Sequence, residues 1–437
     1  MKRLVSLLLA LLLLCAGQAF AGETRAEDFG TGSYHIPVIP IQFPDSPFAE
    51  GELELLEAAL SGADEDVPYR SVKGYYLESS YGKLDLAFDI LPVYTTAQVA
   101  RSYARLYERE TDEDEYLTEE LILQEAMTAL DGEVDFSVYD LDADGMLDGV
   151  VMIYSYPMDY DSDDTLWWAW QNQSYLPDEF DGLTLDYYLW AGIDSLYEST
   201  GLLEEVPCAL TLIHETGHLL GLMDYYDTEF GDRVSGGLGG ADMMDDSVGD
   251  HCSFSKQELG WIEPVRIEGS GEYALRSFPE TGDALLLAKP NAKVSLLDRL
   301  AGITAIEQYE YLLIDLYTPD GLNAPFAEAG ELFSQSGVRV YHVDARPNRQ
   351  EGWYWDPYLY NNSTGDRPLI RLVEADGDGS IPNTSEYDEG GQAQDSDLFH
   401  AGDALTDFCW YDGRPLGYTL RVERLENGEA TLVVEEQ

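Results

Sequence analysis

Histidine, cysteine and basic residues are scarce in this chain of 437 residues, which has 6 histidines, 4 cysteines and 24 lysines and arginines. Acidic residues number 84, so the formal net charge is −60. Charge of this sign repels phosphate groups and membrane surfaces, which argues against nucleic acid as a partner, and it favours cation binding. Because 45% of the residues are hydrophobic and 12% aromatic, we expect a globular protein rather than a disordered acidic polymer.

Long apolar segments are also missing, apart from one at the N-terminus. Lys2 and Arg3 precede a leucine-rich run, Leu4–Leu14, and Ala19-Phe20-Ala21 has the small residues of a cleavage site. The run is short for a membrane span and no stop-transfer charges follow it. The sequence therefore predicts a secretory signal peptide, residues 1–21, and a secreted, extracellular product without a membrane anchor.

Three cysteines follow the predicted cleavage site: Cys208, Cys252 and Cys409. They cannot all pair. One disulfide with one free thiol and three buried reduced cysteines are both compatible with the sequence of a secreted protein.

Two of the six histidines fall in the motif HExxHxxGxxD, which begins at His214. In a helix, a spacing of four residues places His214 and His218 on one face, where both imidazoles can reach one metal ion. Pro207 suits a first helical turn, so we expect this helix to begin near residue 205. The alternative is a buried amphipathic helix whose histidines bind no metal.

The other motif residues complete a catalytic zinc site. Glu215 lies beside the metal, where a carboxylate can take a proton from a zinc-bound water. Gly221 permits the left-handed conformation that ends a helix, so that Asp224 can return as third ligand. Three protein ligands leave one position open for water or substrate, as a catalytic zinc requires.

A glycine-rich run precedes Ala241-Asp242-Met243-Met244-Asp245. In metzincins, a methionine turn downstream of the third ligand forms an apolar floor beneath the zinc ligands. We expect Met244 to take this place, with Met243 as second choice. The alternative is that both methionines simply fill the core.

These motifs and several others occur in the order found in one family, and the chain resembles the immune inhibitor A family of secreted bacterial metalloproteases. The similar segments are PVIPIQFPD (37–45), SVKGYYLESSYGKL (71–84), HETGHLLGLMDYYDT (214–228), DMMD (242–245), SKQELGWI (255–262), GVRVYHVD (337–344) and EADG (374–377). The resemblance implies a zinc endopeptidase with His214, His218 and Asp224 as ligands and Glu215 as the catalytic residue. The chain departs from the family at Tyr225, where an acidic residue commonly follows the ligand aspartate.

A second metal motif lies at residues 140–148. Carboxylates stand at loop positions 1, 3, 5 and 9, a glycine at position 6, and a backbone carbonyl at position 7, as in calcium loops of the EF-hand type. The predicted ligands are Asp140, Asp142, Asp144, the carbonyl of Met146, and Asp148. Position 12 is Val151 instead of glutamate, so Asp135 or a distant carboxylate is needed to complete the shell. An acidic turn without metal is the alternative.

A weaker candidate cation site combines Asp376 and Asp378 with Asp395 and Asp397, although solvated turns use the same residue types. The remaining histidines His251, His342 and His400 are expected to be structural or surface residues.

The fold class expected is α+β. Residues 36–43, 84–93 and 149–154 have strand-like patterns, and residues 50–61 and 97–130 have helix-like spacing. After residue 265, short strands such as 311–316 and 338–341 dominate. We therefore expect a metzincin-like catalytic domain, residues 22–264, with a mixed sheet and an active-site helix, and a β-rich C-terminal domain, residues 265–437.

The function predicted is hydrolysis of peptide bonds in proteins or peptides by a zinc metalloendopeptidase, with Zn²⁺ as catalytic and Ca²⁺ as structural ion. One alternative is a secreted binding protein on an inactivated protease scaffold; another is a zinc-dependent amidase. The sequence leaves the oligomeric state open.

Overall fold

The computed structural model describes residues 29–63, 67–110, 117–158, 165–174, 176–197, 206–228, 237–290, 310–348, 357–363, 367–381 and 392–437. They form a mixed α/β structure with a six-stranded, a five-stranded, a four-stranded and a two-stranded sheet. The predicted signal peptide lies outside these residues. In the part described, no helix has the length and apolar character needed to cross a membrane.

The N-terminal half is built on the six-stranded sheet, whose strand order is β2-β1-β5-β8-β6, with β3 beside β1. Neighbours are parallel except for β6, an edge strand that runs antiparallel to β8. The bounds are β1 Gly32–Gln42, β2 Leu84–Ile90, β3 Tyr94–Thr95, β5 Val150–Tyr154, β6 Trp170–Gln173 and β8 Tyr187–Gly192. The strands predicted within 36–43, 84–93 and 149–154 are confirmed.

Helices cover both faces of this sheet. Alternate residues of a strand point to opposite faces, so each strand packs against both layers of helices. In β1, Val38 packs in the cluster that holds α3, α4 and α7, whereas Ile39 packs in the cluster that holds α5 and α6. The bounds are α3 Glu52–Ser61, α4 Val72–Ser79, α5 Ala100–Tyr107, α6 Thr118–Leu130 and α7 Leu210–Leu219. The helix expected over 97–130 is therefore two helices, α5 and α6.

The helix of the histidine motif, α7, begins later than predicted. Its first residue is Leu210, not a residue near 205, and Ile213 N donates to Ala209 O at 2.8 Å. Before the helix, Cys208 N donates to Leu196 O at 2.9 Å, so this backbone group is used by a neighbouring segment. Pro207 therefore precedes the helix instead of occupying its first turn.

The C-terminal half is rich in strands, which form two sheets. The five-stranded sheet has the order β14-β13-β12-β11-β9, and the four-stranded sheet has the order β10-β17-β16-β15. The bounds are β9 Val265–Arg266, β10 Gly271–Arg276, β11 Ala284–Ala288, β12 Glu310–Tyr317, β13 Gly337–Asp344, β14 Ile370–Leu372, β15 Ala404–Leu405, β16 Tyr418–Glu426 and β17 Glu429–Glu436.

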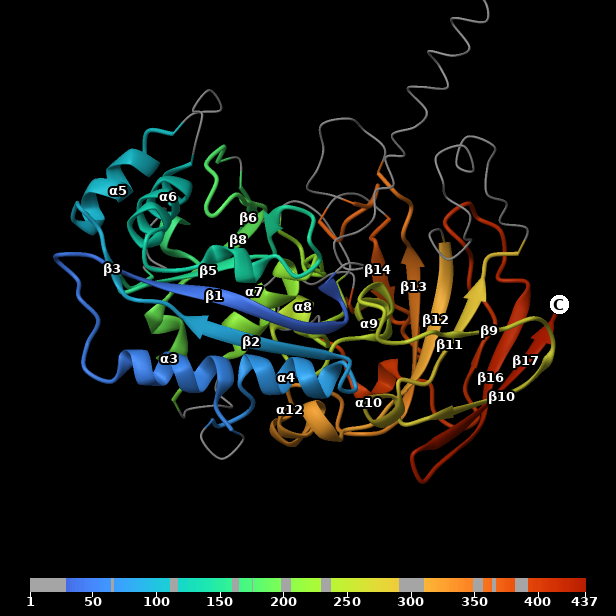
Figure 1. Cartoon of the computed structure of the whole chain (residues 1–437). Coiled ribbons are helices and arrows are strands. Elements are labelled where there is room, and N and C mark those ends of the chain that lie inside the picture. Colours follow the sequence, from blue (N-terminus) through green and yellow to red (C-terminus); the bar gives the residue numbers. More distant parts are fainter. Residues whose placement is uncertain are drawn as a thin grey trace, which may run out of the picture.

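The five-stranded sheet connects the two halves. Tyr311 and Leu313 of β12 belong to the hydrophobic cluster that contains α7, whereas Leu312 and Ile314 belong to the cluster shared with the four-stranded sheet. Helices α7 and α8 (Met243–Asp246) consequently lie between the six-stranded and five-stranded sheets (Figure 1). One continuous core thus crosses residue 265, where the domain boundary was predicted.

Candidate metal centre

The two motif histidines meet the predicted third ligand. α7 places the rings of His214 and His218 with their centroids 4.9 Å apart. The Nε2 atom of each histidine lies 3.1 Å from Oδ1 of Asp224. One ligand atom from each residue lies within 4.8 Å of the others. The structure therefore brings the three predicted zinc ligands to one point.

Asp224 reaches this point because the chain reverses directly after α7. Gly221 has a φ of +96°, a left-handed conformation that strains other residues. Leu222 N donates to Gly217 O at 3.0 Å, and Gly221 N donates to His218 O at 2.9 Å, which closes the helix end. The glycine predicted to end the helix thus has the conformation expected of it.

Backbone carbonyls fix both rings. His214 Nδ1 donates to Met243 O at 2.7 Å, and His218 Nδ1 donates to Leu222 O at 2.9 Å. Since a carbonyl oxygen only accepts, each Nδ1 carries the proton and each Nε2 keeps its lone pair in the neutral ring. This second contact is how proteins orient metal-binding histidines.

The donor set fits a cation. Two Nε2 lone pairs and one carboxylate oxygen face one another, and such an arrangement is repulsive unless positive charge lies between them. Burial lowers the pKa of His218, but Asp224 more than offsets this and raises it to about 9. Burial raises the pKa of Asp224, but His218 and His214 shift it well below its usual range. Two imidazoles and one carboxylate are ligands that zinc takes in catalytic sites.

Glu215 is suited to proton transfer. It follows His214 on α7 and is only 8% exposed. Burial raises the pKa of its carboxyl group, and positive charge on His218 and His214 opposes that shift without cancelling it. A carboxylate with a raised pKa is a stronger base, which is the property that general-base catalysis requires.

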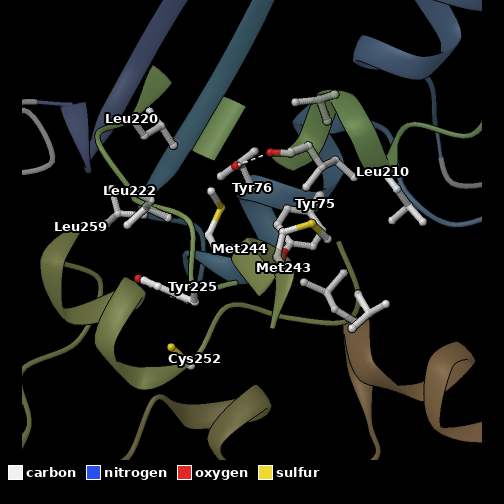
Figure 2. Close-up of a cluster of buried hydrophobic side chains, with 14 of the residues drawn as sticks. Tyr75, Tyr76, Leu210, Leu220, Leu222, Tyr225, Met243, Met244, Cys252 and Leu259 are labelled. Carbon is white, nitrogen blue, oxygen red and sulfur yellow. Dashed lines mark hydrogen bonds between the residues drawn. The ribbon is translucent and has the colours of Figure 1, made fainter. Parts of the chain in front are cut away.

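A sulfur atom packs against the turn of α7 that carries the two histidines. Met244 is fully buried, and a Cβ atom added to Gly217 would come 2.5 Å from its Sδ. The thioether therefore fits the space that the glycine leaves, among the side chains of Figure 2. Met243 is also buried but contributes its carbonyl to His214. Both methionines contact α7. Met244 packs against Gly217, which lies between the two histidines of the motif.

Several supporting residues could not be foreseen from the motif. Tyr76 donates from its hydroxyl to Ile213 O at 2.7 Å, the dashed bond in Figure 2. Asp242 accepts from Met244 N at 2.8 Å and Cys252 N at 2.5 Å. An aspartate before a short helix is a capping signal. No local signal identifies Tyr76, because its partner is far away in the sequence.

A residue of the C-terminal half also hydrogen-bonds to the segment that follows Asp224. Asn362 donates from Nδ2 to Tyr225 O at 2.8 Å and to Ile370 O at 2.9 Å, and it accepts from Ile370 N. This buried amide joins the segment after Asp224 to β14. Tyr225 is thus held by its backbone carbonyl, and its hydroxyl pairs with Ser255.

None of the three cysteines within the described residues forms a disulfide: Cys208 and Cys252 are buried and Cys409 is exposed. The structure thus has three reduced cysteines, but the expectation that all three are buried is wrong for Cys409. None of the three joins the metal groups found among the described residues.

The acidic loop brings together three of its predicted ligands. Carboxylate oxygens of Asp140, Asp142 and Asp148 lie within 4.8 Å of one another. Asp144 is not in this group, and its Oδ1 accepts from Met146 N at 2.7 Å. Gly145 has a φ of +91°, as the bend requires.

Asp135 does not join the carboxylates of the acidic loop. Asp135 Oδ1 instead accepts from Ser137 N and Ser137 Oγ, where it caps a short helix.

The weaker candidate site is made of turns. Asp376 accepts from Asp378 N at 3.1 Å, and Asp395 binds Ser334 and Gln335. Ala375 N donates to the backbone carbonyl of Asp397. Within the described ranges these four aspartates do not form a group with metal-ligand geometry.

The remaining histidines lie outside the metal groups. His251 packs against Tyr75, Tyr76 and Trp261 in the core. His342 Nε2 pairs with Glu310, and His400 Nε2 pairs with Asp395 O.

Comparison with known proteins gives no relative: no protein-family model matches the chain, and no curated protein matches it. The functional argument therefore depends on the geometry of the site.

The fit of Met244 against Gly217 can be tested with Gly217→Ala. Alanine normally stabilises a helix interior by about 1 kcal/mol relative to glycine. Here its Cβ would displace the Met244 thioether, so we expect lower stability and weaker zinc binding, measured by competition with a chelator. Gly132→Ala is the control, since a Cβ there meets nothing within 4 Å. Unchanged zinc affinity in Gly217→Ala would contradict the role of this contact.

A pH dependence is expected from Asp245, whose Oδ2 accepts from Leu238 N at 2.7 Å and Gly240 N at 2.8 Å. Removal from water raises its pKa from the ordinary value of 3.8 to about 7, despite the hydrogen bond from Gly240. The folded state therefore binds more protons than the unfolded state between these values, and stability falls as pH rises, by at most about 1.4 kcal/mol per pH unit.

Asp245→Asn keeps an oxygen for both backbone donors and removes the charge. We expect the variant to gain stability relative to the parent as pH rises from 5 to 7, and the difference to be constant above that. Urea unfolding at several pH values measures it. A difference that does not change with pH would contradict this prediction.

Proposed function

We propose that this protein is a secreted zinc-dependent endopeptidase with a metzincin-like catalytic half. One observation carries the proposal: the Nε2 atoms of His214 and His218 converge on one oxygen of Asp224, each at 3.1 Å. The side chain of Glu215, buried on the same helix, supplies the base. Zinc would be held by the two imidazoles and the aspartate, with a fourth position open.

A zinc ion in such a site polarises the carbonyl group of the scissile bond and lowers the pKa of water. The residues of the chain would transfer the proton, orient the ligands and exclude water. Glu215 accepts the proton of the attacking water and delivers it to the nitrogen of the leaving amine. The carbonyls of Met243 and Leu222 hold His214 and His218 in the required ring orientation. Met244 fills the space under α7, so that water is excluded from that side.

Further support comes from the arrangement of the whole chain. The mixed sheet with α7 beside it is compatible with the predicted metzincin-like half. The resemblance to the immune inhibitor A family covers segments in both halves, and the N-terminal sequence has the features of a secretory signal. Proteins or peptides outside the cell are therefore the proposed substrates.

The test is hydrolysis of casein by the protein spanning residues 22–437, with zinc and calcium present. Glu215→Ala is expected to lose at least about 100-fold in activity, because a positioned general base contributes 10²–10⁴-fold. It should keep one zinc per chain, since the three ligands are unchanged. Glu57→Ala, which removes an exposed glutamate of α3, is the control and should cleave like the parent.

Two outcomes would contradict this proposal. Metal-dependent cleavage by Glu215→Ala at the rate of the parent would exclude the role of Glu215. A parent that binds zinc but cleaves neither casein nor small amides would favour a binding protein on a protease scaffold, whereas cleavage of small amides alone would favour an amidase.

The acidic loop is proposed to bind a structural calcium ion through Asp140, Asp142 and Asp148, with the Met146 carbonyl and Asp144 as the further oxygens of the motif. Calcium should then raise the unfolding temperature in a saturable way, because it binds the folded state. Asp142→Asn should weaken this effect, and Asp135→Asn should not, since asparagine also caps a helix. An equal calcium effect in Asp142→Asn would contradict the site.

A further inference from the structure

Basic residues gather on the face of the five-stranded sheet that points away from the metal centre. In β13 and β14, Tyr341, Val343, Ile370 and Leu372 pack in the cluster that contains α7. The intervening residues His342 and Arg371 are paired in the ladder and point to the opposite face. Four cationic side chains lie around Tyr411 and Glu310 near this point, in a chain that has only 24 in total: Lys289, Arg346, Arg367 and Arg371.

Three of the four cations are neutralised. Lys289 Nζ pairs with Glu310 and, at 3.0 Å, with Asp412. Arg346 Nε lies 3.1 Å from Asp344 Oδ1, and Arg367 Nη2 lies 2.8 Å from Asp344 Oδ2. Asp412 also pairs with Arg414, at 2.8 Å, so five cations and three carboxylates leave an excess of positive charge.

Arg371 contributes to this excess of positive charge. Among the described residues, no carboxylate lies within ion-pair distance of Arg371. Its guanidinium instead lies over the ring of Tyr411, with Cζ 5.6 Å from the ring centroid. An arginine without an acidic partner is unexpected where acidic residues outnumber basic ones more than threefold.

The aromatic rings hold the guanidinium groups in place. Arg367 Cζ lies 4.9 Å from the ring centroid of Tyr360 and 4.8 Å from that of Tyr411. His342 stacks on Tyr411, with centroids 4.2 Å apart and an interplanar angle of 22°. Stacked arginines lose less side-chain freedom when they bind a ligand, so the group is preorganised.

Hydrogen-bond donors of the same group are not satisfied. Arg367 Nε, Arg371 Nε and the Tyr411 hydroxyl are buried and have no hydrogen-bond partner in the part of the chain that the structure describes. A buried donor without an acceptor destabilises the folded state. Three such donors beside an excess of positive charge call for a ligand that has several acceptor atoms and negative charge.

We propose that Arg367, Arg371 and Tyr411 form a binding site for a small carboxylate. A carboxylate matches the planar fork of an arginine with two parallel hydrogen bonds. An anion also matches the excess of positive charge that the ion pairs leave. The site lies on the opposite face of the sheet from His214, so the proposal does not depend on peptidase activity.

The experiment compares the parent with Arg371→Gln and with Arg421→Gln. The second variant removes an exposed arginine of β16 that pairs with Glu423, and so matches the loss of charge. Each protein is titrated calorimetrically with sodium acetate, with sodium chloride at equal ionic strength as the reference. We expect one saturable acetate site in the parent and in Arg421→Gln, and affinity at least about tenfold weaker in Arg371→Gln, since that variant loses charge-assisted hydrogen bonds to the ligand.

Arg371→Lys separates charge from shape. Lysine keeps the positive charge but not the planar fork, so acetate binding should still weaken. This variant also provides the comparison if Arg371→Gln does not fold. Titration with N-acetylglycine distinguishes the source of the carboxylate: tighter binding than acetate identifies the C-terminus of a peptide, and equal or weaker binding identifies a free acid. No saturable heat with the parent, or the same affinity in the parent and both Arg371 variants, would overturn the proposal.

Discussion

The convergence of two imidazole lone pairs and one carboxylate oxygen is the constraint on which the centre of the molecule depends. These atoms repel one another unless positive charge lies between them, yet Asp224 Oδ1 stands 3.1 Å from both Nε2 atoms. The surrounding structure holds them there. The carbonyls of Met243 and Leu222 orient the rings, and the left-handed Gly221 turns the chain so that Asp224 comes back.

That arrangement is supported from both halves of the chain. Tyr76 of α4 bonds the backbone just before His214, and Asn362 bonds the backbone just after Asp224. The five-stranded sheet packs one face against the core that surrounds α7 and the other against the four-stranded sheet. The C-terminal half is thus part of the support of the candidate metal centre, while the face of its five-stranded sheet turned toward the four-stranded sheet carries the cationic group around Tyr411.

What the sequence predicted correctly was mostly local. His214, His218, Gly221 and Asp224 lie within eleven residues, so helix geometry and one turn are enough to place them. The strands of the N-terminal sheet were likewise evident from their apolar residues. Pro207 was misread because a proline before a helix resembles one in its first turn, and only the bond from Cys208 N to Leu196 O distinguishes the two. The contacts of Tyr76 and Asn362 span more than 130 residues, and no spacing in the sequence encodes such distances.

The central claim is that His214, His218 and Asp224 bind one zinc ion together. The most direct test is the zinc content of the protein spanning residues 22–437, measured by mass spectrometry after dialysis against buffered free zinc, beside Asp224→Ala. One zinc per chain in the parent, and at least tenfold weaker binding when the aspartate is lost, about 1.4 kcal/mol or more, is the result that this account predicts. Equal zinc content and affinity in the two proteins would contradict it.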